Sequence, residues 1–135
     1  MNCIYCGGKT HVFNSRLQNR SNNIWRRRRC DECEANFTSI EKLDLGSSIS
    51  VLKSDGSLEP FSSDKLLISI DDSLRHRKSH ISDATALTKT IIDHILGASS
   101  DAVVAASTIQ DISTKILNRF DNVASVHYKA YYSKS

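Results

Sequence analysis

Hydrophobic and polar positions alternate along the N-terminal third of the chain, which predicts a small antiparallel sheet. The alternation from Thr10 to Arg16 has the two-residue period of a β-strand. Residues 17–23 are mostly polar and predict a turn, after which residues 24–29 predict the returning strand. Residues 36–41 predict a third strand, in which Phe37 is expected to be the buried residue.

A second pattern begins after Gly46, where we place a domain boundary. Residues 49–53 and 58–60 alternate like strands around Asp55-Gly56, a dipeptide typical of tight turns, and so predict a β-hairpin. Hydrophobic residues then recur at the spacing of amphipathic helices. The expected stripes are Leu66, Leu67, Ile70 and Leu74; then Leu87, Ile91, Ile92, Ile95 and Leu96; then Ile109, Ile112, Ile116, Leu117 and Phe120; with a last helix from Val123 to Tyr132.

Residues suited to helix ends separate these stripes. The expected caps are, in helix order, Ser62 or Ser63, Ser82, Ser107 paired with Gln110, and Asn122, while Gly97 is expected to stop the second helix. We therefore predict an α+β protein of two domains. Residues 1–46 would form a small β domain, and residues 47–135 a β-hairpin followed by a four-helix bundle.

All four cysteines lie in the first domain, as two matched pairs, Cys3-x-x-Cys6 and Cys30-x-x-Cys33. Two such pairs supply the tetrahedral thiolate set that Zn²⁺ prefers, so we predict a zinc ribbon that binds one ion. Two disulfides, a redox-active pair and simple core thiols are the alternatives. Disulfides are disfavoured because no secretory segment precedes Cys3. A domain near the lower size limit for an apolar core should need the metal to fold.

Positive charge is concentrated between the cysteine pairs. Residues 1–46 hold eight basic and five acidic residues, whereas residues 47–135 hold ten of each. The predicted DNA-binding residues are Arg16, Arg26, Arg27, Arg28 and Arg29, because guanidinium groups match phosphate oxygens. Alternate residues of a strand face opposite ways, so two of the four consecutive arginines would contact nucleic acid. A solvated face is the alternative for the run, and Trp25 is expected in the core rather than as a stacking platform.

Several functions are disfavoured by what the sequence lacks. No run of eighteen apolar residues occurs, so we expect no membrane partner. Absent targeting signals and reduced, metal-bound thiols predict a cytoplasmic location. Neither of the two common glycine-rich phosphate loops is present, and no nucleophile and base form a plausible pair. We therefore do not expect an enzyme. From these patterns alone the second domain would remain a helical module of unknown ligand.

The motifs in their order along the chain resemble the NrdR family, bacterial repressors of ribonucleotide reductase genes. The first domain carries the resemblance in residues 12–16, in the arginine run that enters Cys30, and in residues 37–41. The second resembles that family's ATP-cone in residues 51–56, 59–61, 64–66 and 123–132. The likeness covers almost the whole chain.

The resemblance implies a sensor in which ATP or dATP controls how chains form a homo-oligomer and whether the paired ribbons bind double-stranded operator DNA. Carried over by position, the nucleotide-binding residues would be Val51 at the adenine, Lys53 and Lys65 at phosphate, Glu59 at the base or ribose, and Tyr128 and Tyr132 closing the pocket. Without the resemblance, the lysines would be interpreted as solvated surface charges and the tyrosines as aromatic residues packed in the core. Two other functions stay open: an ATP-cone subunit that docks on ribonucleotide reductase, and a zinc-ribbon protein that binds RNA.

Overall fold

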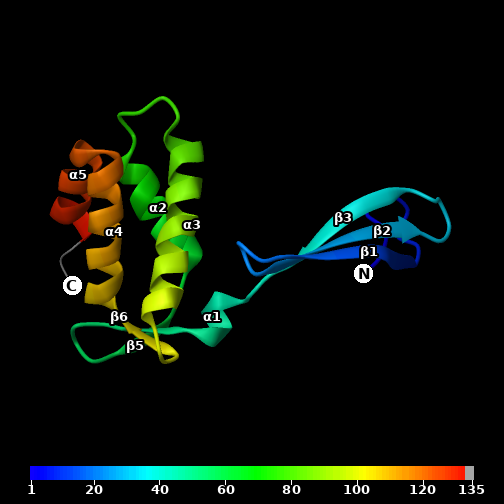
Figure 1. Cartoon of the computed structure of the whole chain (residues 1–135), viewed down its shortest axis with the longest axis horizontal. Helices are drawn as coiled ribbons and strands as arrows, with labels where there is room; N and C mark the ends of the chain where they lie inside the picture. Colours follow the sequence, from blue (N-terminus) through cyan, green and yellow to red (C-terminus); the bar gives the residue numbers. More distant parts are fainter. Residues whose placement is uncertain (133–135) are drawn as a thin grey trace. The chain divides into compact units, whose positions relative to one another are not determined.

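The computed structural model describes residues 1–132, which form two compact units (Figure 1). The first unit comprises Met1–Asp44, and the second begins at Leu45. Among the described residues, no helix has the length and apolar content needed to cross a membrane. The α+β prediction is confirmed, with a strand-only first unit and a second unit of strands and helices.

The first unit is a three-stranded antiparallel sheet with the order β1-β2-β3, as the alternation predicted. Its strands are β1 (Thr10–Gln18), β2 (Asn23–Cys30) and β3 (Asn36–Glu41). The first two strands extend further than expected, so the turn between them shrinks to residues 19–22 and Asn22 takes a positive φ of 52°. A bulge between Val12 and Asn14 shifts the register of β1 against β2.

The core of this sheet is very small, consisting of Cys3, Cys30 and Phe37 among the described residues. The burial of Phe37 confirms the prediction for β3. The expectation that Trp25 belongs to the core is wrong, because Trp25 is only half-buried and lies outside this cluster. Strand alternation explains the difference: Phe37 pairs with Arg28, so Phe37 and Cys30 share one face of the sheet, and Trp25 faces the other.

The second unit contains a short helix and a second three-stranded sheet. These elements are α1 (Leu45–Ser48), β4 (Ser50–Leu52), β5 (Leu58–Pro60) and β6 (Val103–Ala105). The predicted hairpin is confirmed, with Gly56 supplying the positive φ of 84° in the turn. The sheet order is β5-β4-β6, and β6 pairs with β4 in parallel. Neither α1 nor β6 was predicted.

Four helices pack beside this sheet, as the hydrophobic stripes predicted (Figure 1). They are α2 (Ser63–Ser73), α3 (His80–Ala98), α4 (Ala106–Phe120) and α5 (Asn122–Tyr132). Ile70, Leu74, Ile91 and Leu117 have no exposed surface and form the centre of the core. The core continues to Val51 and Val104 of the sheet, so the strands and helices of this unit share one interior.

The helix caps were predicted less well than the stripes. Ser62 caps α2, and its hydroxyl accepts a hydrogen bond from the backbone N–H of Lys65 over 3.2 Å, as expected. The other expectations are wrong. Helix α3 follows Ser79 rather than Ser82, and it continues one residue past Gly97.

At the remaining two helices the capping residue also differs from the prediction. Helix α4 begins directly after β6, so Ala105 takes the cap position and Ser107 lies inside the helix. Before α5 the capping side chain is Asp121 instead of Asn122. Its Oδ1 accepts hydrogen bonds from the backbone N–H groups of Val123 and Ala124, 3.0 and 3.2 Å away.

Candidate metal centre and ligand pocket

The four cysteine sulfurs converge at one end of the first unit. The Sγ atoms of Cys3 and Cys33 are 3.7 Å apart, and those of Cys6 and Cys30 are 3.4 Å apart. All four sulfurs lie within 4.8 Å of one another. A tetrahedral Zn²⁺ site with Zn–S distances of about 2.3 Å requires sulfurs about 3.8 Å apart, so this cluster fits one zinc ion.

Tight turns after each cysteine pair aim these sulfurs inward. Gly7 follows the first pair with a φ of 77°, and Glu34 follows the second with a φ of 61°. The second turn thus adopts the left-handed conformation without the glycine that favours it. Backbone N–H groups of the turns donate to the sulfurs, as Gly8 does to Cys6 and Glu32 to Cys30, each over 3.4 Å.

Because the four thiols lie so close together, their pKa values shift in opposite directions. Hydrogen bonding from the backbone N–H of Cys6 is the largest influence on Cys3 and lowers its pKa to about 7. For Cys6 the Gly8 N–H lowers the pKa, but the side chains of Cys30 and Cys33 outweigh it and raise the value to about 12. Without a cation the neighbouring sulfurs keep Cys6 protonated, and a bound divalent metal would supply the positive charge that lets all four become thiolates.

The arginine run occupies the central strand of the ribbon sheet and is divided between its two faces. Arg26 and Arg28 share the face of Cys30 and Phe37. Arg28 donates to Ser39 Oγ over 3.0 Å and to Thr10 Oγ1 over 3.5 Å, and Arg26 donates to Ser15 Oγ over 3.1 Å.

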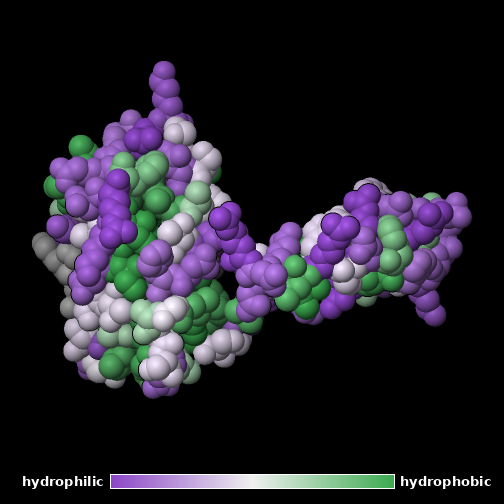
Figure 2. Space-filling view, in the orientation of Figure 1, coloured by the Kyte–Doolittle hydropathy of each residue, from purple (hydrophilic) through white to green (hydrophobic). Residues whose placement is uncertain are grey.

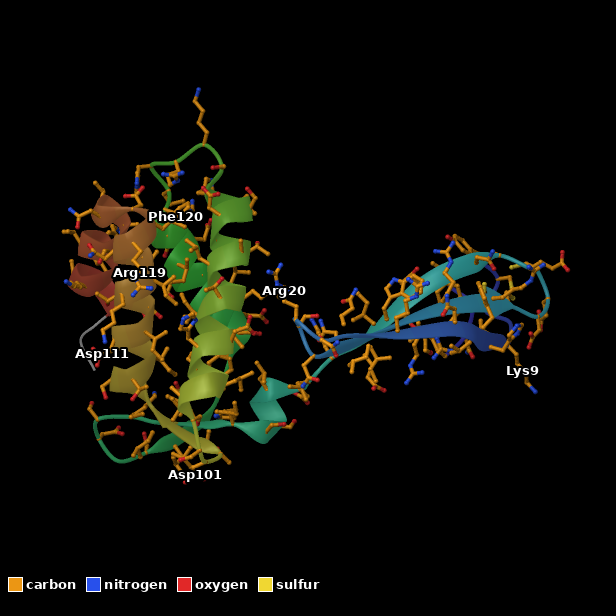
Figure 3. The ribbon with its side chains drawn as sticks, in the orientation of Figure 1. Lys9, Arg20, Asp101, Asp111, Arg119 and Phe120 are labelled. Carbon is orange, nitrogen blue, oxygen red and sulfur yellow. The ribbon has the colours of Figure 1, made fainter. Side chains whose placement is uncertain are left out.

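The opposite face carries Arg27, Arg29 and Trp25, with Arg16 directly across from Trp25. Arg27 donates to Thr38 Oγ1 over 3.1 Å, and Arg29 lies 3.6 Å from a carboxylate oxygen of Glu34. Figure 3 shows two further cations, Lys9 and Arg20, at opposite ends of the sheet. On the face drawn in Figure 2 this unit is mostly hydrophilic, with a few apolar residues between.

The second unit contains a pocket of ≈ 450 Å³, which is within the size range of small-molecule sites. Five of the six predicted nucleotide residues line it: Val51, Glu59, Lys65, Tyr128 and Tyr132. They come from the hairpin, the first turn of α2 and the end of α5. The sixth, Lys53, lies beside the pocket, with its Nζ 3.1 Å from Glu59 Oε2.

Charge and aromatic surface occupy different parts of this pocket. Lys65 lies in the first turn of α2, where the helix N-terminus already favours an anion. The rings of Tyr128 and Tyr132 stack with centroids 5.6 Å apart, and Tyr128 is buried. A ligand with an apolar planar part and an anionic part matches this distribution of side chains.

Sequence reasoning missed part of the pocket wall. Ala106, Ile109 and Gln110 of α4 also line it, as do Phe61 and Ser69. Sequence periodicity assigns Ile109 to a core stripe, and capping chemistry assigns Gln110 to a helix cap. Their part in the pocket depends on β6, which places the start of α4 beside the hairpin, and no local signal in the sequence indicated that strand.

Comparisons with known proteins match both units. Residues 1–41 match the family described as the N-terminal domain of transcriptional repressor NrdR-like proteins, a zinc ribbon. Residues 49–134 match the ATP cone domain. Proteins named transcriptional repressor NrdR are similar over nearly the whole chain. The one from Phenylobacterium zucineum is 35% identical over 133 residues, which is 98% of this chain and 84% of that protein. Those from Neorickettsia sennetsu and Bordetella avium are 33% and 34% identical, and 88% and 82% of their lengths are covered.

Proposed function

Because this chain belongs to the NrdR family of transcriptional repressors, we propose that it represses transcription by binding DNA through its zinc ribbon under the control of adenine nucleotides bound to its ATP cone. The observation that carries the proposal is the presence, in one chain, of an arginine-bearing ribbon around a four-cysteine site and a pocket lined by five of the six expected nucleotide residues. The regulated genes would be those of ribonucleotide reductase.

The ribbon would contact operator DNA mainly through one face. We assign the phosphate contacts to Arg16, Arg27 and Arg29, which share the face opposite the small core. Arg26 and Arg28 lie on the side of the core and hydrogen-bond to β1 and β3, so we assign them to stabilising the sheet. Phosphate contacts of this kind supply affinity that falls as salt rises.

The pocket would bind ATP or dATP. Tyr128, Tyr132 and Val51 provide the apolar surface for adenine, whereas Lys53 and Lys65 provide charge for the phosphates. Glu59 pairs with both lysines and would accept a hydrogen bond from ribose once the phosphates engage them. A polar group left without its partner costs free energy, so a single sugar hydroxyl can separate the two nucleotides.

Nucleotide control would act through assembly of the chain into a homo-oligomer by its ATP cones. A ligand shifts an equilibrium only by the difference between its affinities for the two states. A tenfold difference per subunit amounts to about 1.4 kcal/mol, and several subunits switching together multiply this effect. Oligomerisation thus converts a small difference between two nucleotides into a change in the population able to bind DNA.

Gel-shift titration of ribonucleotide reductase promoter DNA tests the proposal. We expect zinc-loaded protein to shift the promoter fragment with an affinity that differs at least about tenfold between the ATP-loaded and dATP-loaded forms. A scrambled fragment of equal length is the control for sequence preference, and a matching RNA is the control for the nucleic-acid class. Equal affinity in every nucleotide state, or preference for the RNA, would contradict the proposal.

A further inference from the structure

Two ammonium groups in the second unit share one carboxylate oxygen. Oε2 of Glu59 lies 3.1 Å from Nζ of Lys53 and 3.7 Å from Nζ of Lys65. Glu59 stands opposite Val51 in the β4–β5 pair, so strand alternation directs Val51, Lys53 and Glu59 to the same face of the hairpin. The shared carboxylate therefore lies at the wall of the pocket, between the two lysines assigned to phosphate.

Glu59 is held more firmly than one of its two partners. Its side chain is 32% exposed, whereas that of Lys65 is 74% exposed. A hydrogen bond from Lys53, with the added attraction of Lys65, lowers the pKa of Glu59, so this carboxyl is ionised at neutral pH. An anionic oxygen between two ammonium groups is the arrangement that a phosphate oxygen would also satisfy.

We propose that Glu59 takes the place of a phosphate in the ligand-free pocket and is exchanged for one when a nucleotide binds. Phosphate oxygens capture Lys53 and Lys65, and the released carboxylate becomes an acceptor for a hydroxyl of the sugar. This inference rests on the proposed function, because it assigns the reading of ribose to a residue of the same site. Glu59 is thus both a competitor of the phosphates and the residue that distinguishes the sugars.

The exchange couples two steps of recognition. Before phosphates bind, the ion pairs with both lysines reduce the capacity of the Glu59 carboxylate to accept a hydrogen bond from a sugar hydroxyl. We therefore expect a larger affinity ratio for ATP against dATP than for adenosine against 2′-deoxyadenosine. Equal ratios for the two pairs would overturn the coupling, since the sugar would then be read without help from the phosphates.

Inorganic tripolyphosphate tests the competition directly, because it lacks both base and sugar. In calorimetric titrations of the zinc-loaded full chain, Glu59→Gln should bind tripolyphosphate about three- to tenfold more tightly than the unmodified protein, which is the range for loss of exposed ion pairs. The matched control is Asp64→Asn, which removes one negative charge from the exposed residue next to Lys65. That variant should change the affinity by less than about twofold.

A double-mutant cycle separates exchange from a general field effect. If Glu59 acts by occupying the lysines, the gain from Glu59→Gln should fall to about twofold or less when Lys53 is already Gln. An undiminished gain in that background would show that only net charge matters and would overturn the exchange. No gain in the unmodified background would do the same. Failure of the unmodified protein to bind ATP while tripolyphosphate still titrates as described would count against the proposed function alone.

Discussion

The phenolic hydroxyl of Tyr132 donates a hydrogen bond of 2.5 Å to Oδ2 of Asp72, which ties the end of α5 to α2. Tyr132 also stacks on Tyr128 and lines the pocket. One side chain thus closes the ligand site and joins two helices that are far apart in the sequence.

Replacing Tyr132 by Phe should lower the free energy of unfolding of the second unit by about 1 kcal/mol, because one hydrogen bond is lost while the ring stays packed. Urea denaturation followed by helical circular dichroism measures the change. Tyr131→Phe is the matched control, since Tyr131 is 71% exposed. Equal effects of the two substitutions would contradict the role given to the Asp72 contact.

The same hydrogen bond predicts a dependence on alkaline pH. Asp72 raises the pKa of Tyr132 to about 12, above the ordinary tyrosine value of about 10. The folded state therefore favours the neutral phenol, so this contribution is complete below pH ~10 and is lost as the pH rises toward 12. Burial also raises the pKa of Tyr128, so absorbance titration should show two late-ionising tyrosines, and Tyr132→Phe should remove one of them. An unchanged amplitude of late titration in that variant would show that Tyr132 ionises in the ordinary range.

Chelation of the metal should unfold the first unit and leave the second folded. The first unit has only Cys3, Cys30 and Phe37 as its buried hydrophobic cluster, whereas zinc binding is worth roughly 10–16 kcal/mol in such domains. Amide spectra of the full chain before and after addition of a chelator measure this. We expect residues of β1 to β3 to lose dispersion while those of α2 to α5 keep it. Cys30→Ser should reproduce the result without chelator.

Arginines on opposite faces of β2 should respond differently to truncation. Arg27→Ala removes a phosphate contact and should reduce the log–log salt slope of DNA binding by about 0.9. Arg28→Ala removes part-buried hydrogen bonds to Ser39 and Thr10, so it should destabilise the zinc-loaded ribbon by about 1 kcal/mol and leave the slope unchanged. Arg27→Ala loses an exposed hydrogen bond to Thr38, so its effect on unfolding should be smaller. Salt titrations and thermal unfolding of both variants separate the two effects. A reduced salt slope in Arg28→Ala, with no change in Arg27→Ala, would show that the other face of the sheet contacts DNA.

Protonation of Asp121 should reduce the folding stability of the second unit at low pH. A hydrogen bond with His76, then the Ala124 N–H and Arg77, lower its pKa from the ordinary aspartate value of 3.8 to about 2. The folded state therefore favours the carboxylate, and its stabilising effect is present above pH ~4 and lost as the pH falls toward 2. Asp121→Asn keeps a capping oxygen but loses the charge, so its unfolding temperature should change less over this pH range. An unchanged pH profile in that variant would exclude Asp121 as the cause.

The features predicted best from the sequence are those that depend on the spacing of residues close together along the chain. Two Cys-x-x-Cys pairs specify a metal site almost regardless of what separates them, and Asp55-Gly56 specifies its turn through one dihedral angle. Helix stripes are equally local. Caps were less predictable, because several serines near each boundary offer equivalent chemistry. Tertiary contacts then select a residue such as Asp121, which also binds His76 and Arg77.

The pocket is the part that periodicity could not reveal. Its wall combines the hairpin with α2, α4 and α5, and residues such as Ile109 serve both core and pocket. Only the family resemblance brought Val51, Glu59 and Tyr132 together before the fold was known. Even so, the resemblance did not include Gln110, whose position depends on the pairing of β6 with β4.

The parallel pairing of β4 with β6 also affects the order in which the polypeptide matures. Val51 forms its second ladder with Val104, which leaves the ribosome long after the hairpin itself. A nascent chain that has exposed only the hairpin and α2 still lacks the strand that completes the sheet and the helix that follows it. Ligand capture should therefore begin after the ribbon, which precedes all of these elements in the chain, is already available to metal.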